Sequence, residues 1–134
     1  MALALIIGAY ATAPKSYCAT VEDKYYSHLC EIPNLSGWEV PFLIGNVFDI
    51  NEAVMLPRFK GRTVVLSTIP ITMSYLEELN TFGLAADDHI GRCLAIDMAK
   101  EALAAVLRIN AYTGEQTVIA VQFHSAPGIS RGGY

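Results

Sequence analysis

Thr63-Val-Val-Leu-Ser-Thr-Ile-Pro70 is the most informative stretch for the fold, and Thr117-Val-Ile-Ala-Val-Gln-Phe-His124 repeats its character. Each is a short run of β-branched and apolar residues that lacks the alternation of a strand with one face in water. A parallel strand covered by helices has this composition, because neither of its faces meets solvent. One long helix-like segment separates the two runs, so the pair predicts a β–α–β unit with a parallel crossover.

The chain before Thr63 looks like earlier copies of the same unit. A buried strand is predicted at Leu3–Ile7, and apolar residues at helical spacing predict a helix over Thr20–Glu31. Gly37–Phe42 is predicted to form a second strand, and Asp49–Met55 a short helix. The predicted element order is therefore β–α–β–α–β–α–β.

The segment between the third and fourth strands is expected to be helical. Met73–Leu79 could form a turn or two, and the longest helix is expected after Asp87 and Asp88. Their charges suit the positive end of its dipole, and Asn110 and Gly114 are expected to close it. The predicted core face of this helix is a stripe at spacings of three and four, made of Ile90, Cys93, Leu94, Ala99, Leu103, Val106 and Leu107.

These units predict about half of an eight-stranded TIM (β/α)8 barrel. Right-handed crossovers between neighbouring strands place all helices on one side of the sheet. A doubly wound sheet is the competing architecture, but no G-x-G-x-x-G follows the first strand. Because half a barrel leaves two unpaired parallel edges, we expect residues 1–134 to be one partial barrel domain. A C-terminal half or another copy, in a homo-oligomer, would complete it.

The composition is richer in apolar residues than that of an average soluble domain. Of 134 residues, 53% are hydrophobic and 16% charged, so part of the apolar surplus is expected at an interface. The net charge of −4 argues against a nucleic-acid partner. No segment approaches the ~18 consecutive apolar residues that span a membrane. The apolar amino terminus is expected to be the first strand rather than a signal peptide, since no Lys or Arg precedes it.

The cysteines indicate a reducing compartment. Cys18, Cys30 and Cys93 are an odd number without a C-x-x-C spacing, which argues against a disulfide framework or a zinc knuckle. Reduced thiols in a cytoplasmic protein are the expected state, with Cys93 packed in the core.

Several short motifs occur in one order along the chain: Ile6–Ala11, Gly37–Phe42, Thr68–Pro70 with Thr72-Met73, Phe82–Ala85, Gly91-Arg92 and His124–Pro127. Together they resemble the amino-terminal half of an uncharacterised family of xylose-isomerase-like TIM-barrel proteins, a domain of unknown function. The resemblance implies a superfamily rich in sugar isomerases, epimerases and metal-dependent endonucleases. In that superfamily the metal ligands lie largely on later strands, and Gln122 stands where a Glu would be natural.

Ligand groups in such a barrel cluster where strands end, which selects Tyr10, Glu39, Thr68, Gln122 and His124. Glu39 is the sharpest candidate, because a carboxylate inside an apolar strand is costly unless paired or used. It is predicted to be a general base, a metal ligand or the acceptor of a sugar hydroxyl. The alternative is a structural hydrogen bond to a neighbouring strand end or an Arg.

Two further side chains could contribute to a site. His124 could bind a metal or transfer a proton together with Glu39, or its ring could simply be satisfied by loop backbone. Arg92 could clamp an anionic group, or it could pair with Asp87 or Asp88.

The resulting hypothesis is an isomerase or epimerase for a small polyhydroxylated substrate, assisted by a divalent metal ion (Mg, Mn or Zn). Glu39 and His124 would be the catalytic residues and metal ligands, and the substrate would be bound by Tyr10, Thr68, Gln122 and Arg92. The competing hypothesis is a non-catalytic half-barrel that persists only by self-association or with a partner chain.

Overall fold

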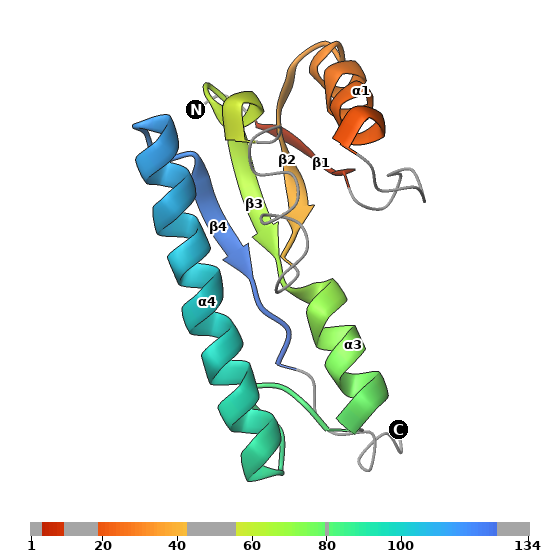
Figure 1. The fold of residues 1–134 in the computed structure, drawn as a ribbon, viewed down its shortest axis with the longest axis vertical. Helices are drawn as coiled ribbons and strands as arrows, with labels where there is room; N and C mark the ends of the chain where they lie inside the picture. Colours follow the sequence, from red (N-terminus) through yellow and green to blue (C-terminus); the bar gives the residue numbers. More distant parts are fainter. Residues whose placement is uncertain (1–3, 10–18, 43–55, 80, 126–134) are drawn as a thin grey trace.

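The structure, a computed structural model, describes residues 4–9, 19–42, 56–79 and 81–125. In these ranges the chain forms a four-stranded sheet flanked by helices (Figure 1). The strands stand in the order β1-β2-β3-β4 and every pairing is parallel, which confirms the α/β class and a partial set of (β/α) units. The strand bounds are Leu5–Gly8 for β1, Leu35–Pro41 for β2, Thr63–Ser67 for β3 and Val118–Gln122 for β4.

Three helices accompany the sheet in the described part of the chain: α1 Ala19–Cys30, α3 Ile69–Leu79 and α4 His89–Thr113. Figure 1 shows α1 beside β1 and β2, α4 alongside β4, and α3 continuing from the carboxyl end of β3. A helical turn at residues 56–59 precedes β3. The helix predicted at Asp49–Met55 lies outside the described residues. None of the described helices has the length and apolar character needed to cross a bilayer.

One face of the sheet carries the hydrophobic core. Trp38, Val64 and Val118 lie in register across β2, β3 and β4, and all three are buried. Trp38 stacks on Tyr26 of α1 with ring centroids 5.9 Å apart, and it meets Phe59 edge-on at 6.5 Å. Buried residues of α4 join the same cluster. Helices α1 and α4 therefore cover the same face, as right-handed crossovers predict.

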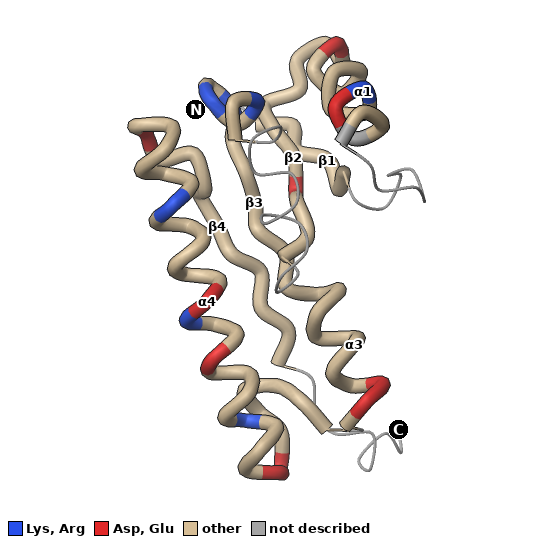
Figure 2. Tube along the Cα trace, in the orientation of Figure 1, with Lys and Arg blue, Asp and Glu red and all other residues tan. Residues whose placement is uncertain are grey.

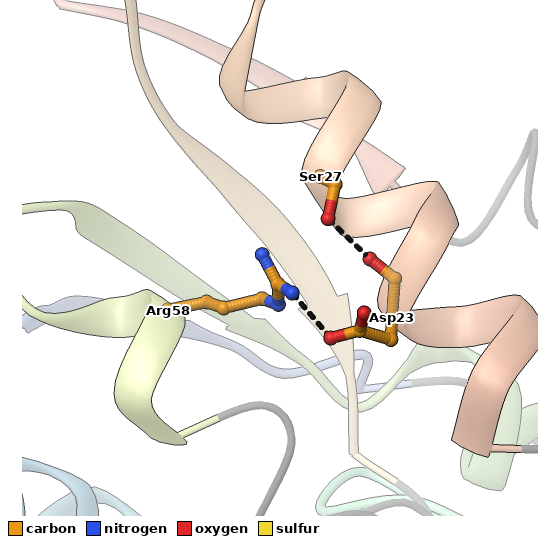
Figure 3. A network of polar contacts seen from close by, with 3 residues as sticks. All are labelled: Asp23, Ser27 and Arg58. Atoms are coloured by element: carbon orange, nitrogen blue, oxygen red, sulfur yellow. Dashed lines mark hydrogen bonds and ion pairs between the residues drawn. The ribbon is translucent and has the colours of Figure 1, made fainter.

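A charged contact joins α1 to the turn before β3 (Figure 3). Arg58 forms an ion pair with Asp23 through Nη2 and Oδ1. Ser27, one turn further along α1, donates a hydrogen bond to the Asp23 carbonyl oxygen at 2.7 Å. Because the Asp23 side chain is about half exposed, this pair orients α1 more than it stabilises the fold.

The carboxyl end of β3 differs from the sequence prediction. The strand ends at Ser67, and both Ile69 and Pro70 already belong to α3. Proline is tolerated in the first turn of a helix, because amide hydrogens there have no helical acceptor. The Thr72 amide donates to the Thr68 carbonyl oxygen at 3.0 Å. As a result α3 is an 11-residue helix instead of a turn or two.

Both ends of α4 form as predicted. Asp88 is the N-cap, and its side chain accepts a hydrogen bond from the Gly91 amide at 2.7 Å. Gly114 ends the helix in the left-handed conformation, with φ of 75°, and its amide donates to the Asn110 carbonyl oxygen at 2.9 Å. Sequence signals at helix ends are local, so they hold without knowledge of the packing.

The predicted core face of α4 is wrong for most of its residues, although Leu94 and Val106 do pack against the core. Leu103 and Leu107 are 57% and 63% exposed, and Cys93 is exposed as well. The buried side of α4 is rich in small residues, which allow close packing. At Gly91, for example, a Cβ would lie only 2.9 Å from the Thr81 carbonyl oxygen in the loop before the helix. The buried face consists of Gly91, Ala95, Met98, Ala102, Ala105, Ile109 and Thr113.

Candidate functional site

The face of the sheet opposite the aromatic core carries the candidate site. Successive side chains of a strand point to opposite faces, so Glu39 and the residues in register with it point away from the Trp38 side. These partners are Gly8 on β1, Val65 on β3 and Ala120 on β4. All of them are exposed or half-buried, whereas Trp38 is fully buried. This second face is therefore the more open one.

Glu39 is the single charged residue in the four described strands, and charge colour appears on the sheet only on β2 (Figure 2). Its carboxylate lies near β1, where a Cβ built on Gly8 would be 3.8 Å from Oε2. The other oxygen, Oε1, is buried and has no hydrogen-bond partner among the described residues. Leaving a buried acceptor unpaired costs about 1–3 kcal/mol, and more for a charged group. The structural role expected as the alternative for Glu39 is therefore not seen within these ranges.

Thr68 and Gln122 meet where β3 and β4 end. The Gln122 carbonyl oxygen accepts two hydrogen bonds from Thr68, one from the amide at 3.1 Å and one from the hydroxyl at 2.9 Å. Thr68 is fully buried, and the hydrogen bond from its hydroxyl links the end of β3 to the end of β4. The role of Thr68 in substrate binding stays a prediction that would rest on the remaining lone pairs of its hydroxyl oxygen.

Ser67 is a site residue that the sequence reasoning missed. Its buried hydroxyl donates to Oε1 of Gln122 at 3.3 Å, from one strand to the next. This contact orients the exposed Gln122 amide and leaves the NH2 group as the end that can donate to a ligand. The available signal was a polar residue closing an apolar strand, directly before Thr68.

Among the described residues, no hydrogen bond or ion pair joins Glu39 to Arg92 or His124. The Arg92 Nη1 donates to the carbonyl oxygens of Ala86 at 2.6 Å and Asp87 at 2.7 Å, so it holds the loop that leads into α4. These acceptors are backbone atoms, not the expected carboxylates. His124 is exposed and follows β4 by two residues. Tyr10 lies outside the described residues.

A complete metal centre is not assembled by the described residues. Within them, no group of three or more His, Cys, Asp and Glu side chains converges to hold a metal ion. The unpaired oxygen of Glu39 suits one ligand position, whereas zinc takes about four ligands and magnesium about six. A divalent metal therefore does not fit these residues alone.

The architecture places the chain among α/β proteins built from successive parallel β/α units, with helices over one face of the sheet. A family model described as Domain of unknown function (DUF4862) matches residues 6–133. The chain belongs to this family. No solved structure matches the chain with significance.

The chain is also similar to an uncharacterized protein, STM3670, of Salmonella typhimurium strain LT2. The two share 29% identity over 126 residues. The match covers 91% of this chain but 40% of the Salmonella protein, so the chain spans well under half the length of this relative. The activity of such a longer protein is not shown by the part that is matched.

Proposed function

We propose that the chain contributes the first β/α units of a xylose-isomerase-like TIM barrel that acts on a small polyhydroxylated substrate, as an isomerase or epimerase. In this proposal Glu39 accepts the hydrogen of a substrate hydroxyl and acts as the general base. His124 lies just beyond the end of β4 and would be the second proton-transfer group. The resemblance of the ordered motifs to that barrel family supports the choice of substrate class.

The observation that carries the proposal is the unpaired oxygen of Glu39. A buried carboxylate oxygen that accepts no hydrogen bond lowers the stability of the folded state, and Oε1 of Glu39 has no partner among the described residues. Groups that are costly to the fold concentrate at binding and catalytic sites, where a ligand supplies the missing partner. A hydroxyl is such a partner, because it donates one hydrogen and can also accept.

Gln122 adds a donor to this acceptor. Because Oε1 of Gln122 is engaged by Ser67, its NH2 group is the end available to a ligand. Two strand spacings, about 10 Å in total, separate β2 from β4. That distance leaves room for a small molecule between two long side chains, with one hydroxyl donating to Glu39 and another accepting from Gln122.

The proposed chemistry of Glu39 does not require a metal ion. Glu39 supplies one suitable oxygen and His124 could supply a ring nitrogen, but further ligands would have to come from outside the described residues. A Lewis acid bound beside Glu39 would polarise a carbonyl or hydroxyl oxygen. No step of the proposal depends on it.

The test is a thermal-shift screen of the chain against aldoses, ketoses and linear polyols, each alone and with Mg²⁺, Mn²⁺ or Zn²⁺. A ligand that binds only the native state stabilises it by about 2.7 kcal/mol at one hundred times its Kd. We expect at least one polyol to raise the melting temperature of the wild type. Glu39→Gln should abolish this shift, and the exposed Glu78→Gln on α3 should retain it. A panel without any shift, or a shift that survives Glu39→Gln, contradicts the proposal.

A second candidate function is favoured by the open sheet. The outer strand β4 carries exposed apolar side chains at Ile119 and, just beyond its end, at Phe123. A non-catalytic half-barrel that persists by association with another chain would need such a surface. It predicts self-association without any response to polyols or metals.

A further inference from the structure

Helix α4 has an apolar side that no part of the described fold covers. Ile96, Leu103 and Leu107 recur at spacings of seven and four, which places them on one side of the helix. They are 46%, 57% and 63% exposed. The exposed Lys100 lies on this same side, four residues after Ile96, and its Nζ donates to Oδ1 of Asp97 at 2.8 Å. The buried small residues of α4 form a different side. A surface helix that packs only against its own domain has one apolar and one polar side. Because α4 has a second apolar side, we expect another polypeptide to cover it.

The sheet is open at both of its outer strands. Among the described residues β1 pairs only with β2, and β4 pairs only with β3, so each leaves half of its backbone polar groups unpaired by strands. Each also exposes an apolar side chain, Leu5 at 47% on β1 and Ile119 at 52% on β4. Native proteins protect such edges, because an unpaired edge strand pairs readily with another chain.

We propose that a second copy of this chain covers these surfaces, with β4 of each copy pairing in parallel with β1 of the other. Because all four strands are parallel and stand in sequence order, a two-fold axis makes both junctions identical. Two sets of four strands then give the eight strands of a closed barrel, and no edge is left. Helix α4 lies beside β4 at the junction (Figure 1), so its apolar side meets the helical layer of the second copy.

This arrangement has a consequence for the candidate site, although it does not rest on the proposed function. Glu39 points away from the helix-covered core face, and that second face becomes the barrel interior. The two copies then place two sets of Glu39, Ser67 and Gln122 inside one barrel.

The test is the oligomeric state of the purified chain, measured by light scattering after size exclusion over a concentration series. We expect twice the chain mass of 14.6 kDa. The double variant Leu103→Lys/Leu107→Lys, and separately Ile119→Lys, should raise the dissociation constant at least about tenfold, as loss of central apolar contacts does. Met73→Lys is the matched control, because Met73 is 51% exposed on α3, away from both edges.

Hydrogen exchange distinguishes the closed ring from other dimers. In the dimer the amides of both β1 and β4 should exchange slowly, and both should become fast in Leu103→Lys/Leu107→Lys. A monomeric wild-type chain overturns the proposal and assigns the surface to further β/α units of a longer polypeptide. A dimer that protects β4 but not β1, or that resists the α4 and β4 variants, also overturns it.

Discussion

The two faces of the sheet are built by the same strands but from different chemistry. On the helix-covered face, Trp38 is enclosed by Tyr26 and Phe59, and Val64 and Val118 continue the row. On the other face the register partners of Glu39 are a glycine, a valine and an alanine. The first face is filled by large side chains, whereas the second is lined by small ones around one carboxylate.

The residues of the first face stabilise the folded state, whereas Glu39 on the second face destabilises it. Apolar burial is the main favourable term on the first face. On the second, Oε1 of Glu39 is buried without a hydrogen-bond partner among the described residues, and such an oxygen opposes folding. In the proposed site, a ligand hydroxyl would supply the missing partner. The comparison therefore makes opposite predictions for neighbouring positions of β2.

Trp38→Ala should have the largest effect. Removal of this buried ring leaves a cavity between α1 and the sheet, and we expect a loss of about 3–5 kcal/mol of unfolding free energy. Urea denaturation of the variant and the wild type measures it. The matched change on the other face, Val65→Ala, should cost clearly less because Val65 is only half-buried. Equal losses would mean that both faces are packed alike.

Glu39→Gln should act in the opposite direction. The substitution keeps the shape and leaves one polar atom unpaired, but it removes the negative charge, so the unfolding free energy should stay constant or rise by up to about 2 kcal/mol. The exposed Glu78→Gln should remain within about 0.5 kcal/mol of the wild type. If Glu39→Gln instead destabilises the chain in chemical denaturation, Glu39 has a structural partner and the contrast between the faces fails.

Ser67→Ala should have a smaller effect. It removes one neutral hydrogen bond of 3.3 Å to a glutamine that water can reach, and the expected loss is about 0.5–1.5 kcal/mol. The more informative readout is polyol affinity, since the freed Gln122 amide is no longer oriented. Ser67→Thr keeps the hydroxyl and serves as the control. An unchanged affinity in Ser67→Ala would remove Ser67 and Gln122 from the site.

Lys100→Ala on the outer side of α4, which belongs to neither face, should have the smallest effect. The hydrogen bond that Lys100 donates to Oδ1 of Asp97, together with the negative charge of Asp97, raises the pKa of the Lys100 side chain above its ordinary value of 10.5. A raised lysine pKa stabilises the folded state below the ordinary value, and the contribution is lost as pH rises through the raised one. Because both side chains are largely exposed, the urea midpoint at neutral pH should not change measurably. A clear shift of the urea midpoint at pH 7 would contradict this prediction.

The elements of the fold could be predicted because their signals are local. The strand at Thr63–Ser67, the start of a long helix after Asp87 and Asp88 and its end at Gly114 each depend on a few neighbouring residues, and all three are confirmed. The predicted start of α3 is wrong: the helix begins at Ile69 and not at Met73. Proline usually ends a helix, and only knowledge of the helix start shows that Pro70 lies in its first turn. Local rules thus identified the elements better than their exact ends.

The packing and the site could be predicted only in part. The buried side of α4 was missed, because its alanines give a weaker hydrophobic signal than the exposed Leu103 and Leu107. Glu39 was selected as the unusual carboxylate, and the structure adds its unpaired oxygen. The contact of Ser67 with Gln122 could not be foreseen, because it depends on the register of two strands that are 55 residues apart in sequence. Such long-range pairs are fixed by tertiary structure alone.

The order of the strands has a consequence for how the chain is made. Since each strand pairs with the one synthesised just before it, the sheet can grow in the direction of translation, without waiting for a distant segment. At every stage the newest strand is the unprotected one, and β4 is the newest in the described residues. A nascent chain at that stage presents Ile119 and Phe123 to its surroundings. Transiently exposed apolar surface and unpaired strand edges promote aggregation, so β4 is the strand of this sheet that most needs protection during synthesis.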